Sequence, residues 1–126
     1  MTGKVSIHLA RAYDDLSQVH GARLLVDRLW PRGVQKEHLH LSEWTRDIAP
    51  SNALRQWFGH DPDKWQTFRQ RYTAELDNNP EAVAQCAAWL HKGAVTLLYG
   101  AKDREHNNAV VLAEYLAHHV KKKRKS

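Results

Sequence analysis

The sequence predicts one α/β domain with a small, mostly parallel sheet between two layers of helices, the doubly wound, three-layer arrangement of Rossmann-like proteins. Its 126 residues are enough for a single domain with one hydrophobic core. Short apolar or alternating runs, typical of strands, are separated by longer segments with apolar residues at helical spacing. Strands joined by helical crossovers favour parallel pairing, with helices covering both faces of the sheet.

Three strands can be read directly from the chain. Val5–Ala10 alternates between apolar and polar residues, and a polar loop or short helix over Tyr13–Gly21 follows it. Arg23–Trp30 contains a continuous apolar run and is stopped by Pro31, whereas Val95–Tyr99 is apolar almost throughout. Because sheets of this kind usually have four or five strands, we expect one or two more in the segments of irregular sequence.

Two short helices are expected in the middle of the chain. Ser42 can cap a turn or two that continue to Asp47. Ser51 can cap a second helix over residues 52–58, and Gly59 stands where a helix C-terminus favours glycine.

Three longer helices complete the expected domain. The first starts at Asp61-Pro62, a capping carboxylate followed by proline, and its apolar face comprises Trp65, Phe68, Tyr72 and Leu76. The second starts at Asn79-Pro80 and ends at Gly93. Asp103 or a near neighbour starts the third, whose inward face comprises Ala109, Leu112 or Ala113, Leu116 and Val120. Residues 1–120 therefore form the predicted domain.

The net charge of +5 comes entirely from the end of the chain. Residues 121–125 are all Lys or Arg, and without them 14 basic residues balance 14 acidic ones. A terminal run of like charges repels itself and stays solvated, so residues 121–126 are expected to form a disordered, solubilising tail. A weak contact with nucleic acid or a membrane surface is the alternative, since lysine neutralises phosphates without reading sequence.

Cysteine content and hydropathy indicate the compartment. The single cysteine, Cys86, excludes an internal disulfide and favours a reducing environment, and its apolar helix face predicts an inert, buried thiol. The chain starts without the apolar run of a signal peptide and has no apolar stretch long enough for a bilayer. We therefore expect a cytoplasmic monomer or homodimer that does not insert into a membrane.

Polar side chains gather after two of the predicted strands, where open α/β sheets bind ligands. The first cluster follows the second strand and contains Asp27, Arg28, Trp30, Arg32 and Lys36. Arginines on both sides of a proline turn can clamp a phosphate or carboxylate, and an indole ring can stack on a ligand. These residues are predicted to bind substrate.

The second cluster follows Val95–Tyr99 and leads into a helix N-terminus, which favours anions. Here His106 is a candidate general acid or base, Asp103 or Glu105 would orient it, and Asn107 would contact the substrate. If the two strands are neighbours, both clusters face one crevice. The alternative is structural: Asp27 and Arg28 would tie strand to loop, and Asp103 would only cap the helix.

No other motif suggests a cofactor or a metal. The nine histidines show no zinc-site spacing on a defined helix, and the chain contains no phosphate-binding glycine loop, no GxGxxG and no GxSxG. We therefore expect neither a metal nor a cofactor, and neither standard nucleotide hydrolysis nor serine hydrolysis.

Several long motifs resemble a bacterial family. They are Leu25-Val26-Asp27-Arg28-Leu29-Trp30-Pro31-Arg32-Gly33, Leu54-Arg55-Gln56-Trp57-Phe58-Gly59-His60-Asp61-Pro62 and His106-Asn107-Asn108-Ala109-Val110-Val111-Leu112. On these residues the chain resembles the YeaO-like family, part of the bacterial group named domain of unknown function 488. The resemblance implies a compact cytoplasmic α/β protein and no particular reaction. The wider group often carries Cys-His-Arg where this chain has Glu105-His106-Asn107, so cysteine-based chemistry is not expected.

Three functions remain open from the residues. The first is a small enzyme or binding protein for an anionic, phosphorylated or carboxylated small molecule, with the two clusters as its site. The second is a nucleic-acid-associated module in which Arg28, Arg32, Arg55 and the basic tail contact phosphates and Trp30 or Trp57 stacks on a base. The third is an interaction protein with tryptophans on a dimer surface.

Overall fold

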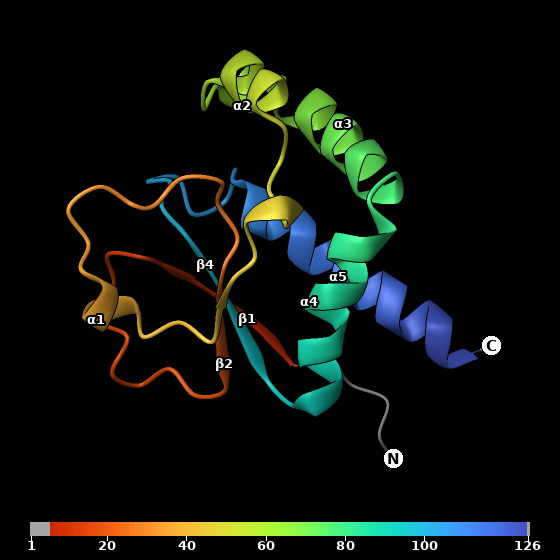
Figure 1. Cartoon of the computed structure of the whole chain (residues 1–126). Helices are drawn as coiled ribbons and strands as arrows, with labels where there is room; N and C mark the ends of the chain where they lie inside the picture. The colour runs from red at the N-terminus through yellow and green to blue at the C-terminus, as the bar shows by residue number, and fades with distance from the viewer. Residues whose placement is uncertain (1–5, 126) are drawn as a thin grey trace.

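A four-stranded sheet, parallel throughout, forms the centre of the computed structural model, which describes residues 6–125 and their side chains as far as Val120 (Figure 1). The strands are β1 (Ile7–Arg11), β2 (Ala22–Leu25), β3 (Glu43–Trp44) and β4 (Val95–Tyr99). Their order across the sheet is β1-β4-β2-β3, so β4 is flanked by β1 and β2. The parallel sheet between helices that the sequence predicts is confirmed.

The fourth strand lies where the sequence predicts a short helix, and the prediction of a helix over residues 42–47 is wrong. Trp44 pairs with Leu25 as part of β3, and a 3-10 turn begins only at Arg46. The Ser42 hydroxyl does not cap a helix; it accepts a hydrogen bond from the Arg23 N–H of β2. Pairing with the sheet therefore outweighs the local capping signal, as tertiary contacts commonly do in short segments.

Strand β2 ends earlier than predicted. The Val26 N–H still donates to the Leu98 carbonyl, but residues 27–29 bend away from the sheet and are not part of the expected strand over Arg23–Trp30. This bend lifts the following polar side chains above the carboxyl edge of the sheet.

The helices in the middle of the chain begin and end largely as their capping residues predict, whereas the last helix begins at Asn108, later than the predicted start at Asp103 or a near neighbour. They are α1 (Lys36–Leu39), α2 (Asn52–Phe58), α3 (Trp65–Asp77), α4 (Pro80–Lys92) and α5 (Asn108–Lys125). The Ser51 hydroxyl accepts a hydrogen bond from the Leu54 N–H, and Gly59 ends α2 in the left-handed region at φ 52°. Asp61 accepts from the Asp63 N–H before α3. The Asn79 side chain does not cap α4; its amide donates to the Asp47 carbonyl.

The last helix extends into the basic segment. Helix α5 includes the backbone of residues 121–125, which the sequence predicts to be a disordered tail, while Ser126 lies outside the described residues. Helical geometry there agrees with the high helix propensity of lysine and arginine. No helix within residues 6–125 combines the length and the apolar character needed to cross a membrane.

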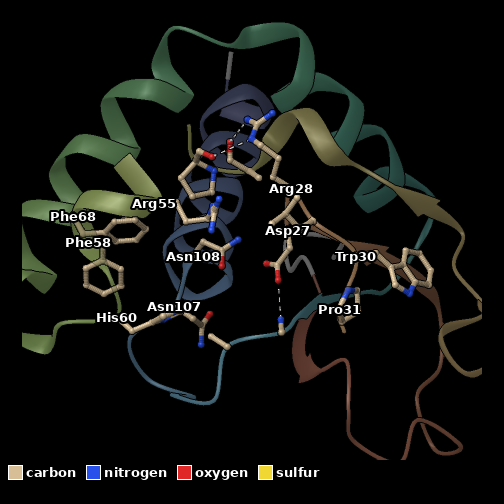
Figure 2. Close-up of a pocket in the computed structure, with 15 residues that line it drawn as sticks. Asp27, Arg28, Trp30, Pro31, Arg55, Phe58, His60, Phe68, Asn107 and Asn108 are labelled. Carbon is tan, nitrogen blue, oxygen red and sulfur yellow. Dashed lines mark hydrogen bonds between the residues drawn. The ribbon is translucent and has the colours of Figure 1, made fainter. Parts of the chain in front are cut away.

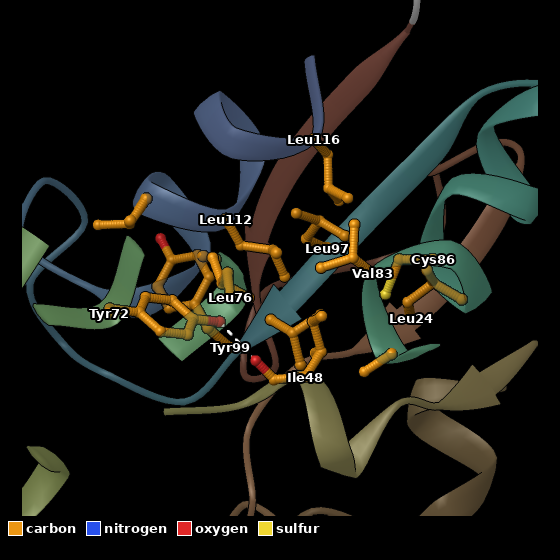
Figure 3. Packing of buried hydrophobic residues seen from close by; sticks show 14 of the residues in the cluster. Leu24, Ile48, Tyr72, Leu76, Val83, Cys86, Leu97, Tyr99, Leu112 and Leu116 are labelled. Carbon is orange, nitrogen blue, oxygen red and sulfur yellow. Dashed lines mark hydrogen bonds between the residues drawn. The ribbon is translucent and has the colours of Figure 1, made fainter. Parts of the chain in front are cut away.

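Alternating residues of the central strands supply two hydrophobic clusters, one on each face of the sheet. Leu24 and Leu97 face the layer of α3, α4 and α5, whereas Leu25 and Leu98 face α1 and the long loops (Figures 1 and 3). The predicted stripe on α3 is buried in the larger cluster, apart from Trp65, which is half-buried. This packing holds the carboxyl ends of β2 and β4 side by side.

Two polar groups in the larger cluster are accommodated without strain on the fold. The Tyr72 hydroxyl donates to the Ile48 carbonyl over 2.7 Å and so fixes the segment before α2 on helix α3. Cys86 is fully buried, and this burial raises the pKa of its thiol to about 11. The thiol therefore stays protonated near neutral pH and is a poor nucleophile.

Candidate functional site

A cleft of about 240 Å³ opens at the carboxyl edge of the sheet (Figure 2). It lies where the segments after β2 and β4 meet, with α2 and the start of α5 on its other side. The β2–β4 pairing makes the two predicted strand ends neighbours, which is the condition under which both clusters were to face one crevice. The residues that line it are Asp27, Arg28, Leu29, Trp30, Pro31, Ala49, Pro50, Arg55, Phe58, His60, Phe68, Gly100, Ala101, Asn107 and Asn108.

Asp27 lies in the middle of this cleft. Its Oδ2 atom accepts a hydrogen bond of 2.8 Å from the Gly100 N–H, which links the ends of β2 and β4, and its other oxygen is directed into the cleft (Figure 2). Burial raises the pKa of the Asp27 carboxyl, although the Gly100 N–H, Asn108 and the nearby His60 and Arg55 act in the opposite direction.

The raised pKa of Asp27 gives a testable pH dependence. A carboxyl whose folded-state pKa exceeds the unfolded value of about 4 contributes most at low pH, and its contribution falls as pH rises through the folded-state pKa. Asp27→Asn keeps an oxygen for the Gly100 N–H and removes the buried charge. We therefore expect the variant to gain stability relative to wild type as the pH rises from about 4 to about 7, measured by urea unfolding. A stability difference independent of pH would contradict this.

Arg28 holds the cleft together and does not project freely into it. Its guanidinium donates to the carbonyls of Ala49 and Pro50, over 3.2 and 3.4 Å, so it ties the end of β2 to the loop before α2 (Figure 2). This is the structural alternative that the sequence left open for Arg28. Its effect on the site is to position the Ala49-Pro50 wall of the cleft.

Two residues of the cleft with nitrogen donors, Arg55 and His60, are absent from the clusters predicted as the small-molecule site. Arg55 is an exposed residue of α2, and its guanidinium makes one long hydrogen bond of 3.4 Å to Asn52. His60 follows Gly59 and has a φ of 59°, a left-handed conformation that costs energy in a residue other than glycine. In the sequence, only Gly59 indicated that these two residues could reach the cleft, because it ends the helix and turns the chain toward the strand ends.

One wall of the cleft is aromatic. The rings of Phe58 and Phe68 stack with a centroid separation of 4.3 Å, and Trp65 packs behind both. Pro31 lies on the opposite side (Figure 2), and Leu29, which is 60% exposed, also lines the cleft. A ligand in the cleft therefore meets apolar surface on two sides.

The predicted catalytic pair forms, but it lies beside the cleft and does not line it. His106 Nδ1 is 2.9 Å from Asp103 Oδ2, and the imidazole packs edge-on against Trp65 at 5.1 Å. The Glu105 N–H is the main cause that lowers the pKa of Asp103, followed by His106. Asp103 thus orders the loop before α5.

Asn107 lines the cleft, but its polar atoms are engaged in the protein. The side-chain oxygen accepts from the Val110 N–H at the start of α5, and the amide donates to the Asp103 carbonyl. Next to it, the Asn108 amide donates to the Val26 carbonyl and joins α5 to the end of β2.

The remaining residues predicted to bind substrate are spread over a wider surface. Trp30 lines the cleft and also a shallow groove on its other side, together with Lys36 and Trp44. The Trp30 indole N–H donates to the Val34 carbonyl, and the ring meets Trp44 edge-on at 5.4 Å. Arg32 is exposed and lines neither hollow. The structure thus separates Arg32 and Lys36 from the cleft.

A metal centre is not formed by the described part of the chain, in which no three His, Cys, Asp or Glu side chains gather closely enough to hold an ion. The cleft itself offers Asp27 and His60 as the only side chains of these types.

The fold and the cleft define this chain as a small, open-sheet parallel α/β protein with a hollow at the carboxyl ends of adjacent strands. Within that class it belongs to the family described as the inactive DUF488-N3 subclade, whose match covers residues 6–126. It is 43% identical to the uncharacterized protein YeaO of Escherichia coli K12, over 89% of this chain and 97% of YeaO. It is 34% identical to the uncharacterized protein Rv3073c of Mycobacterium tuberculosis H37Rv, over 92% of this chain and 98% of the relative. No solved structure matches the chain.

Proposed function

We propose that this protein binds an anionic small molecule in the cleft and does not transform it. The observation that carries the proposal is the position of Arg55, an exposed guanidinium at the rim of a hollow whose walls are otherwise largely apolar. A few convergent polar groups in an apolar hollow are typical of small-ligand sites. Guanidinium is suited to carboxylate and phosphate because it offers two parallel N–H donors.

Three observations support a binding role over a catalytic one. The only His–Asp pair in the described side chains, His106 and Asp103, lies outside the lining of the cleft. Arg28 is engaged with backbone carbonyls. The family itself is described as inactive. A cleft that only binds and releases a molecule needs neither a His–Asp pair in its lining nor a free Arg28 guanidinium.

The Asp27 carboxylate fixes where the anion can lie. Two negative charges at the centre of a half-buried cleft would repel each other strongly, so the anion belongs on the side of Arg55 and His60. His60 adds a second donor there, and it adds positive charge when protonated.

The test compares Arg55 with Arg32, which is also exposed but does not line the cleft. Orthophosphate, acetate and benzoate are titrated calorimetrically into wild type, Arg55→Gln and Arg32→Gln, with thermal unfolding as the check on folding. We expect at least one of the three anions to bind wild type, and Arg55→Gln to weaken it about tenfold or more, because a charge-assisted hydrogen bond is lost. Arg32→Gln, the matched control outside the cleft, should leave the affinity unchanged.

Two results would contradict the proposal. Loss of binding in Arg32→Gln but not in Arg55→Gln would place the anion at the Pro31 turn. Absence of binding at millimolar concentration would remove the anion site altogether. The non-catalytic part is tested separately, since conversion of a bound anion to a new species, followed by NMR, would show an active protein.

Contact with nucleic acid has less support from the described side chains. Arg28 is occupied by the loop carbonyls, and the Trp57 ring lies beneath Lys64 and Arg71, at 5.1 and 4.6 Å from its centroid. That ring is therefore covered by protein cations on the surface where a base would stack.

A further inference from the structure

The groups that line the cleft define its ligand more closely than as an anion. They face one another across the hollow and belong to different parts of it. An aromatic wall, an acceptor and a cation belong to different segments of the chain and line the same hollow. Each of them selects one part of a ligand.

The aromatic wall selects a flat apolar body. Phe58 and Phe68 are 5% and 2% exposed and stack on each other, so they form a fixed apolar wall that does not have to be ordered on binding and that shows a ligand only a small part of each ring. Pro31 lies on the opposite side (Figure 2), and Leu29 also lines the hollow. A volume of about 240 Å³ accommodates a single ring with its substituents, and a flat apolar ring is suited to a fixed apolar wall.

Asp27 selects a hydrogen-bond donor. Its Oδ2 atom is held by the Gly100 N–H, so the carboxylate cannot turn away, and its second oxygen is directed toward the space a ligand would fill (Figure 2). Gly100 has no Cβ, and one placed there would lie 3.2 Å from Oδ2, so glycine lets the carboxylate sit this close to the backbone. A ligand that covered this oxygen without donating to it would leave a buried acceptor unpaired.

Arg55 selects an acid at another point of the same ligand. Helix α2 carries its guanidinium to the rim above Asn108, separate from the loop that bears Asp27 (Figure 2). The acid and the donor must therefore be attached at different positions of the ring. A ring that bears both groups satisfies all three parts of the cleft.

We infer that the ligand of this cleft is an aromatic or heteroaromatic acid that carries an N–H or O–H donor on its ring, with the donor on Asp27, the acid on Arg55 and the ring against Phe58 and Phe68. The inference rests on the proposed function, because it names the class of anion that the cleft binds. Inorganic phosphate lacks the ring, and simple aliphatic carboxylates such as acetate lack both the ring and the donor.

The experiment uses ligands that differ in one group. The 3- and 4-aminobenzoates are compared with the 3- and 4-methylbenzoates, which have nearly the same shape but no donor, and with acetate, which has no ring. Affinities are measured by ligand-observed NMR and calorimetry for the full chain, as wild type, Asp27→Asn and Arg55→Gln.

We expect one aminobenzoate isomer to bind wild type about tenfold or more tightly than its methyl partner, and both to exceed acetate. In Asp27→Asn the side-chain oxygen must remain on the Gly100 N–H, so the amide N–H₂ faces the ligand donor and the preference for amino over methyl should disappear. Arg55→Gln should weaken amino and methyl acids alike.

The possible failures can be told apart. Equal binding of amino and methyl acids to wild type, with both still dependent on Arg55, would overturn the inference and leave the proposed function standing. Acetate binding as tightly as the ring acids would overturn the role of the aromatic wall. No binding of any acid would overturn both the inference and the proposed function.

Discussion

Gly21→Ala is expected to lower the free energy of unfolding by roughly 3 kcal/mol or more, the largest effect of a single methyl group in this protein. Gly21 has a φ of 88°, a left-handed conformation that alanine adopts only under strain. A Cβ at this position would lie 2.4 Å from the Ala94 carbonyl oxygen and 2.9 Å from its carbon. Both are backbone atoms, so neither can move aside without a shift of the strand.

The contact matters because it lies where two central strands begin to pair. The Ala22 N–H donates to the same Ala94 carbonyl, and β2 then runs beside β4 to Leu98. Displacing Ala94 disturbs this first hydrogen bond and the register that follows. The loss is measured by urea or thermal unfolding, where several kcal/mol lower the midpoint of a domain of this size by about 10 °C or more.

Gly33→Ala is the matched control for this clash. Gly33 also has a left-handed φ, 77°, but a Cβ there would meet no atom within 4 Å. Only the conformational strain remains, and the expected loss is about 1 kcal/mol. Equal losses in the two variants would show that contact with Ala94 does not contribute.

Phe68→Ala is expected to lower the free energy of unfolding by about 3–5 kcal/mol. Phe68 is 2% exposed and lies among Phe58, Trp65 and Tyr72, with ring centroids at 4.3, 5.8 and 5.8 Å. Truncation removes both its buried apolar surface and its stacking contacts, and it leaves a void that α2 and α3 cannot close completely.

The same ring is also part of the cleft, so the variant has a second expected effect. Phe68→Leu keeps an apolar side chain of intermediate volume and should lose clearly less stability than Phe68→Ala. Both variants should bind an aromatic acid less tightly than wild type does, because the stacked ring is absent. Unfolding curves and calorimetry measure the two effects independently. A loss of less than about 1 kcal/mol in Phe68→Ala would contradict the packing described for this ring.

Local signals in the sequence were sufficient for most of the helical framework. Ser51 and Gly59 delimit α2 as predicted, because capping depends on backbone groups only a few residues away. The stripe through Phe68, Tyr72 and Leu76 predicts the buried face of α3 for a similar reason, since side chains one turn apart share a face. Strand β4 was recognised by its apolar run.

Segments whose structure depends on distant partners were predicted less well. Glu43–Trp44 forms a strand only because β2 lies beside it, and nothing within two residues signals this. Strand β2 ends at Leu25 and not at Trp30 as predicted, because the backbone bends away from the sheet directly after Val26. In both cases the deciding hydrogen bonds join residues far apart in the sequence, about 20 positions for β3 and 72 positions for the bond from Val26 to Leu98.

The candidate site, like the fold, was predicted only as far as local sequence signals allow. The sequence by itself determined that polar residues follow β2 and β4, and that these residues belong near the carboxyl edge of a parallel sheet. Only the tertiary structure decided which of them reach the cleft. Arg28 donates hydrogen bonds to carbonyls of the loop before α2, and α2 places Arg55 at the rim of the cleft. Side-chain direction depends on packing between elements far apart in sequence, which no local pattern encodes.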